Sequence, residues 1–225
     1  MGYATPPAVV AVGVWSIVTL SGMQRPELGG LFAHVTGASV PVTLAPTRLG
    51  DEPTIDRAWF AGTTERLAAF DLRPTGDWVV QRAAYRGWLR FFVDTGGTLA
   101  AFGAQTTYPG GPPPNVGFIS ACSPVGTSDP IAGATRWIET ADEIVPPEDT
   151  GYPPFLRMKL APGAELPALR ALHDQHVDRV CDGAPLLAID EPALRTVFQA
   201  DRQWWFDWCA QSLVGMMADC RPPQD

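Results

Sequence analysis

The segment RGWLRFFVDTGGTLAAFGAQ, residues 86–105, determines the kind of fold that this chain can adopt. Residues 86–93 and 98–105 are rich in aromatic, aliphatic and small side chains, and each stretch has the length of a β-strand. Asp94-Thr95-Gly96-Gly97 lies between them, and its two glycines can supply the positive φ that a tight hairpin requires. The sequence therefore predicts an antiparallel hairpin here.

Further predicted strands flank this hairpin, and proline-rich loops such as residues 108–114 (YPGGPPP) separate them. Successive strands without intervening helices favour an antiparallel meander over parallel βαβ units. An extended stretch is also expected at residues 40–44. We expect about six antiparallel strands, at residues 77–81, 86–93, 98–105, 115–122, 134–140 and 155–161.

Amphipathic helices are predicted on both sides of the strand region, with Pro, Asp or Glu at their starts and glycine after several of their ends. They occupy residues 26–37, 51–70, 165–181 and 190–218. Helices from both ends of the chain can then cover one face of the sheet. The predicted fold class is α+β, with one domain formed by residues 25–225.

The first 24 residues contain no charged side chain, and residues 8–20 (AVVAVGVWSIVTL) form a continuous apolar run. This run approaches the length that crosses a thinned or tilted bilayer, and no positively charged signal-peptide region precedes it. We therefore expect residues 1–24 to form a single-pass membrane anchor. A buried core element and a cleaved signal peptide are the alternatives, and the flanking charges do not give the side of the membrane.

Composition limits the class of partner. The chain has 225 residues, of which 46% are hydrophobic and 18% charged, as expected of a folded domain. Its net charge of −8, without a local Lys/Arg cluster, would repel a phosphate backbone, so nucleic acid is not an expected partner. Lys159 is the only lysine and Asn115 the only asparagine, a bias expected of a GC-rich bacterial coding sequence.

No known catalytic, phosphate-binding or zinc-binding motif occurs in the chain. The four cysteines form no CxxC pair. Cys122 is expected to be a buried thiol in a strand. Cys181 could reach either Cys209 or Cys220, so the sequence does not decide whether a disulfide forms. We predict no metal and no cofactor.

Two histidines are weak candidates for a site. His173 falls within the apolar stripe of the predicted helix 165–181, and His176 lies one turn further along at its flank. Imidazoles at this spacing can share a metal ion or a proton path. The pattern supplies no third ligand, so we expect His173 to be a hydrogen-bonded core residue and His176 to be half exposed.

The last predicted helix has an unusually wide apolar arc that includes Trp204, Trp205 and Trp208. Tryptophan is enriched at protein interfaces because it covers a large area and has few rotamers. These three residues are therefore candidates for a contact with another protein, and core packing is the alternative.

Taken together, these features favour a non-enzymatic, membrane-tethered domain that acts through protein contacts, such as an accessory subunit of a membrane assembly. One alternative is a small-molecule-binding domain with an aromatic pocket, for which Trp88, Phe92 and Phe102 are candidates. Another is an enzyme that uses His173 or His176.

Overall fold

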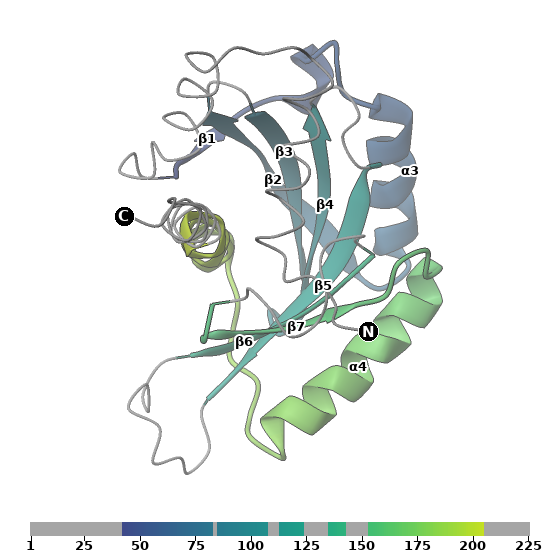
Figure 1. Cartoon of the computed structure of the whole chain (residues 1–225). Helices are drawn as coiled ribbons and strands as arrows, with labels where there is room; N and C mark the ends of the chain where they lie inside the picture. The colour runs from purple at the N-terminus through teal and green to yellow at the C-terminus, as the bar shows by residue number, and fades with distance from the viewer. Residues whose placement is uncertain (1–41, 83–84, 108–112, 124–134, 143–152, 205–225) are drawn as a thin grey trace, which may run out of the picture. The chain divides into compact units, whose positions relative to one another are not determined.

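The structure is a computed structural model that describes residues 42–82, 85–107, 113–123, 135–142 and 153–204. Its strands form one seven-stranded sheet whose spatial order follows the chain order, β1 to β7 (Figure 1). The strands are β1 (Leu44–Pro46), β2 (Leu72–Arg82), β3 (Tyr85–Asp94), β4 (Ala100–Thr107), β5 (Asn115–Cys122), β6 (Arg136–Ala141) and β7 (Leu156–Leu160). The helices are η2 (Leu49–Asp51), α3 (Arg57–Ala68) and α4 (Leu166–Cys181), and residues 191–204 are also helical.

The predicted α+β class with an antiparallel sheet is confirmed, with one exception at its end. Strands β1 to β6 pair antiparallel, but β7 pairs with β6 in parallel. A parallel pair needs a connection of a dozen or more residues, and the segment 142–155 has that length. The expectation that every strand belongs to one antiparallel meander was therefore wrong for β7.

The second predicted helix begins later than its acidic start signal suggested. The Asp56 side chain accepts a hydrogen bond from the Trp59 backbone N–H at 2.9 Å, so Asp56 is the N-cap of α3. The earlier residues 51–53 instead end η2 and form a turn. The acidic residues before the apolar run thus predicted a helix here. Which of Asp51, Glu52 and Asp56 caps it depends on the tertiary structure.

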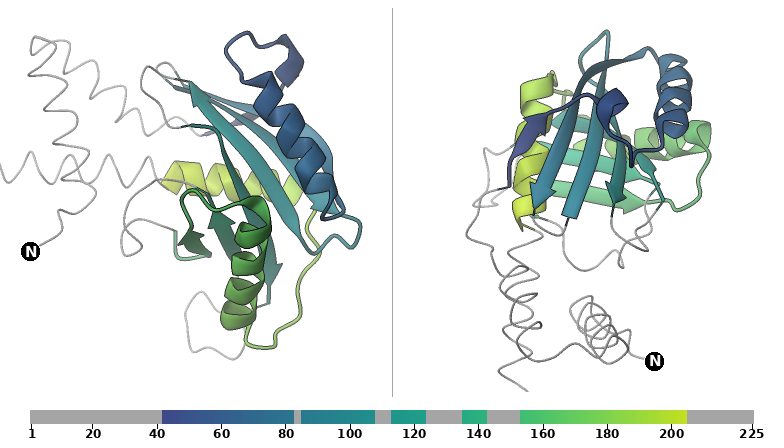
Figure 2. Two further views of the ribbon diagram at one scale, coloured as in Figure 1. Left: turned by 90° about the vertical axis from the view of Figure 1, so that its right-hand side faces the viewer. Right: turned by 90° about the horizontal axis from the view of Figure 1, so that it is seen from above.

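Helices cover both faces of the sheet, which corrects the prediction that they would cover one face only (Figure 2). The rings of Phe91 and Phe102 lie opposite each other on β3 and β4, and both contact Phe198 of the last helix at centroid distances of 5.0 and 4.9 Å. The next residue of β3, Phe92, packs on the other face with Phe118 beneath α3 and α4. Successive side chains of a strand point to opposite faces, so consecutive buried aromatics require two covering layers.

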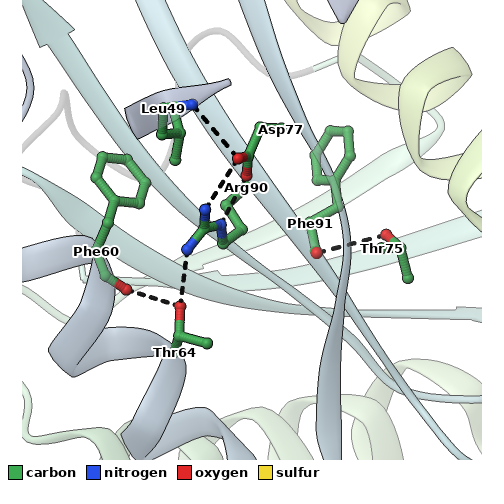
Figure 3. Close-up of polar contacts among 7 residues, drawn as sticks. All are labelled: Leu49, Phe60, Thr64, Thr75, Asp77, Arg90 and Phe91. Atoms are coloured by element: carbon green, nitrogen blue, oxygen red, sulfur yellow. Dashed lines mark hydrogen bonds and ion pairs between the residues drawn. The ribbon is translucent and has the colours of Figure 1, made fainter. Parts of the chain in front are cut away.

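An ion pair links the first strands to α3, as Figure 3 shows. Arg90 and Asp77 are opposite each other on β3 and β2, with Nε–Oδ1 at 2.6 Å and Nη2–Oδ2 at 2.9 Å. Arg90 Nη1 also donates to Thr64 Oγ1 of α3 at 3.2 Å, and the Leu49 backbone N–H donates to Asp77 at 3.5 Å. The hydrogen bonds and charge of Asp77 raise the pKa of Arg90. The bidentate pair therefore connects four elements through directional charged bonds.

The hairpin between β3 and β4 forms where the sequence predicts it. Only Gly97 of the two glycines has a positive φ, +67°, and its N–H donates to the Asp94 carbonyl at 3.0 Å. The Asp94 side chain accepts the N–H groups of Thr98 and Leu99 at 2.9 and 3.0 Å. Asp94 and Gly97 together thus determine the turn.

The membrane prediction falls outside the structure. No helix within the described ranges is long and apolar enough to cross a bilayer. The predicted anchor, residues 1–24, and the predicted helix 26–37 lie outside the described residues.

The turn generates a test of stability. Gly97→Ala should lower the free energy of unfolding by about 1–2 kcal/mol, because an L-residue is strained at this φ although the added methyl group has room. Gly62→Ala, in α3 and equally free of close contacts, should raise it by roughly 0.5–1 kcal/mol. Urea denaturation of both variants checks this pair of opposite signs. Equal effects at the two positions would show that φ at residue 97 does not control the turn.

Candidate functional site

Helix α4 places both histidines against the sheet. The helix packs on β5 and β6, and Leu166 and Leu169 join the core cluster that contains Phe118. Pro occupies its first turn, and Asp182 ends it in the left-handed conformation with φ 46°. His173 therefore faces strands rather than solvent, as its place in the apolar stripe predicts.

The imidazole of His173 is fully buried and is held by two hydroxyl groups. Its Nε2 lies 3.0 Å from Ser120 Oγ of β5, and its Nδ1 lies 3.3 Å from Thr140 Oγ1 of β6. The ring also lies 6.0 Å from the Phe118 ring, centroid to centroid. We refer to His173, Ser120, Thr140 and His176 as the histidine cluster.

One assignment of protons satisfies every contact of His173. The Ser120 hydroxyl donates to the Thr98 carbonyl at 3.3 Å, because a carbonyl can only accept. Ser120 Oγ is then an acceptor for the Nε2–H of His173, and the unprotonated Nδ1 accepts the hydroxyl hydrogen of Thr140. His173 is thus a neutral imidazole with its proton on Nε2.

His176 is buried, with 9% of its surface exposed, and not half exposed as the sequence suggested. Its Nδ1 lies 3.4 Å from Thr140 Oγ1, and the ring also hydrogen-bonds to the Glu139 backbone. Thr140 therefore stands between the two imidazoles. The flank of α4 is covered because β6 continues the sheet beneath it.

The environment disfavours the charged form of both rings. Burial lowers the pKa of His173 to about 3, and the positive charge of Arg170 and the neighbouring His176 act in the same direction. Burial also lowers the pKa of His176, helped by Lys159 and Arg179 and opposed by the hydrogen bond to the Glu139 backbone. Both histidines are accordingly neutral at pH 7.

The geometry limits what the histidine cluster can do chemically. A serine beside an imidazole can be a nucleophile beside its base, but here the serine hydrogen is already donated to Thr98 and the Ser120 residue is 2% exposed. No group of three or more His, Cys, Asp or Glu in the described part of the chain could hold a metal ion. As it stands, the cluster is a hydrogen-bonded core network that joins α4 to β5 and β6.

Sequence reasoning missed the two hydroxyl partners. Ser120 and Thr140 each occupy a position in a strand whose neighbours on the same face are apolar, such as Phe118 and Ile138. A lone hydroxyl on a buried strand face implies a polar partner above it. That signal could have connected these strands to His173 before the structure was known.

The other candidate residues are distributed over separate places. Trp88 and Phe92 lie on the face beneath α3 and α4, whereas Phe102 lies on the opposite face against Phe198. The expectation that these three residues lie on one aromatic face of the sheet was therefore wrong. Of the interaction candidates, Trp204 is half-buried, and Trp205 and Trp208 lie outside the described residues.

No protein-family model matches this chain, and no curated protein or solved structure shows significant similarity to it.

The histidine cluster generates a pH test. The pKa of His173 is about 3 in the folded state and 6.5 in the unfolded state, so between these values only the unfolded chain binds a proton at this residue. The free energy of unfolding should therefore decrease by about 1.4 kcal/mol for each pH unit below 6.5, and this decrease should stop near pH 3. Urea denaturation at pH 7 and pH 5 should show a smaller pH dependence for His173→Gln than for the natural protein.

His176→Gln is the matched comparison: burial lowers the pKa of His176 as well, but this residue is 9% exposed whereas His173 is fully buried, so its replacement should remove less of the pH dependence than His173→Gln does. A natural pH dependence in His173→Gln would mean that the His173 ring is not kept neutral by burial.

Proposed function

We propose that this protein is a non-enzymatic domain that acts through contacts with another protein, and that residues 1–24 hold it at a membrane as part of a larger assembly. The observation that carries the first half of this proposal is the edge of the sheet formed by β7. Strand β7 is the last strand in the sheet order and pairs only with β6 among the described residues.

The backbone of β7 alternates between paired and outward-pointing groups. The Trp137 N–H donates to the Phe155 carbonyl, and the Ala161 N–H donates to the Ala141 carbonyl, both at 2.9 Å. In a parallel ladder every second residue faces the same neighbour, so Arg157 and Lys159 also point their backbone groups to β6. The N–H and C=O groups of Leu156, Met158 and Leu160 therefore point away from β6, where an added strand could bind them.

The side chains of β7 define the partner that this edge would accept. Arg157 and Lys159 are opposite Ile138 and Thr140 in the register, on the face covered by α4, and Lys159 lies close enough to lower the pKa of His176. Leu156, Met158 and Leu160 occupy the other face. A fitting strand would thus carry acidic residues on one face and apolar residues on the other.

A second copy of this chain fits the edge poorly. Two β7 strands paired antiparallel about Met158 would place the two cations of one copy opposite those of the other on one face. Like charges directly opposite each other destabilise a strand pair. The charge pattern therefore favours an acidic, extended segment of a different protein.

A peptide experiment tests this mode of contact. A strand-length peptide of alternating Glu and Val should bind the full chain and shift the backbone amide signals of Met158 and Leu160 in NMR spectra. A peptide of alternating Lys and Val is the control and should bind roughly tenfold more weakly. The double variant Arg157→Glu/Lys159→Glu should reverse this preference.

Met158→Pro separates backbone pairing from charge, because it removes an outward N–H and leaves the ladder to β6 intact. We expect this variant to lose Glu/Val peptide binding with little change in melting temperature. Equal binding by Met158→Pro, or amide shifts located elsewhere, would contradict strand addition at β7.

The membrane half of the proposal rests on the uncharged apolar run and is tested separately. Full-length protein should stay with membranes after carbonate or high-salt extraction, and a chain that begins at Gln24 should be released. Release of both proteins under the same conditions would contradict the anchor and leave the proposal at β7 unaffected.

A further inference from the structure

Two cysteines that are far apart in the sequence meet beneath the end of α4. Cys122 is the last residue of β5 and Cys181 the last residue of α4, and both are reduced and buried. They share a cluster with Ile138, packed by Val177 and Val180, and Cys122 lies close enough to raise the pKa of the Cys181 thiol. The sequence suggested Cys209 or Cys220 as partners for Cys181, and both lie outside the described residues. Within the described part of the chain, Cys122 lies beside Cys181.

Backbone contacts of the chain that follows Cys181 keep the end of α4 next to the end of β5. After α4 the chain reverses at Asp182 and Gly183, both with positive φ, and the Ala184 N–H donates to the Cys181 carbonyl at 2.8 Å. The chain then returns to β5: Leu186 forms a β-bridge with Cys122, and the Leu187 N–H donates to the Ala121 carbonyl at 2.8 Å. The proximity of the thiols is thus built into the main chain.

A third contact ties the end of α4 to β6. Arg136 pairs with Cys122 in the strand register, and its Nη1 donates to the Val180 carbonyl at 3.2 Å. This bond satisfies one of the last carbonyl groups of the helix, which have no partner within the helix itself. The helix end therefore cannot shift from Cys122 without losing bonds to both strands.

We propose that Cys122 and Cys181 are a reversible dithiol–disulfide pair that locks the C-terminal end of α4 to the sheet, with a low-molecular-weight disulfide as the oxidant. This inference is independent of the proposed function. Cys181, the less completely buried of the two, loses its proton and attacks one sulfur of the small disulfide, which releases one small thiol and leaves a mixed disulfide. Cys122 then loses its proton and attacks the protein sulfur of that bond, which releases the second small thiol.

The balance of this reaction is complete. Two protein thiols are oxidised to one disulfide, the small disulfide is reduced to two thiols, and the two protein protons end on those thiols. Exchange proceeds through the thiolate, and burial together with Cys122 raises the pKa of Cys181 to about 12. Oxidation should therefore be slow in the native state and faster when the turn after α4 opens.

The test uses the full chain with Cys209→Ser and Cys220→Ser, so that only the proposed pair remains. The protein is incubated with glutathione disulfide, alone and in urea below the unfolding transition, and then alkylated after denaturation. We expect slow loss of both alkylation sites, acceleration by urea, and a peptide map that joins Cys122 to Cys181. The oxidised protein should melt roughly 10 °C above the reduced protein, and dithiothreitol should reverse this shift.

Two controls separate the bond from other effects of oxidation. In Cys122→Ala and in Cys181→Ala, on the same background, glutathione disulfide should leave the melting temperature nearly unchanged. The natural chain shows whether Cys209 or Cys220 competes: a map dominated by either of them joined to Cys181 would overturn the proposal. Persistence of two alkylatable thiols after prolonged oxidation in urea would overturn it as well.

Discussion

Burial of both faces of β3, β4 and β5 is the constraint on which the rest of the structure depends. Consecutive aromatics on β3 can be buried only if one helix layer covers Phe92 and another covers Phe91. The same crowding requires glycine where a ring lies on the neighbouring strand. A Cβ at Gly117 would lie 2.6 Å from Cζ of Phe102, so no larger residue fits there while that ring keeps its place.

A sheet enclosed on both faces leaves its polar side chains without water, and each of them needs a partner within the protein. Under α4 the partners of His173 are hydroxyl groups from two strands, and the cysteine pair lies at the helix end. Between β2 and β3 the polar contact is a charged pair: Arg90 and Asp77 keep about a fifth of their side-chain surface exposed and are also bonded to Thr64 and Leu49. Neutral hydrogen bonds thus occur where the side chains are fully buried, and the ion pair occurs where they keep some contact with solvent.

Local signals in the sequence predicted most elements and the antiparallel order of β2 to β6, but not which face of the sheet each helix covers. The hydrogen bonds and the positive φ that form the turn all come from residues 94–99, so the hairpin could be predicted from the local sequence. The two-sided cover could not, because the apolar face of the last helix shows that it needs a partner without showing which face of the sheet it meets. The parallel direction of β7 and the meeting of His173 with Ser120 and Thr140 depend on long-range packing, for which a single helix pattern holds no information.

Helix α4 carries both His173 and Cys181, yet pH and oxidation change the free energy of unfolding by different physical effects. Protonation of His173 depends on the difference between its folded and unfolded pKa, so it determines how the free energy of unfolding changes with pH. A disulfide from Cys181 to β5 restricts the unfolded chain and adds a contribution that is independent of that difference. Oxidation therefore raises the whole pH profile without changing its slope, provided that the His173 ring keeps its hydrogen bonds. A change of slope would instead mean that closing the bond moves α4 relative to Ser120 and Thr140, so the slope reports whether the helix is already in its locked position when the thiols are reduced.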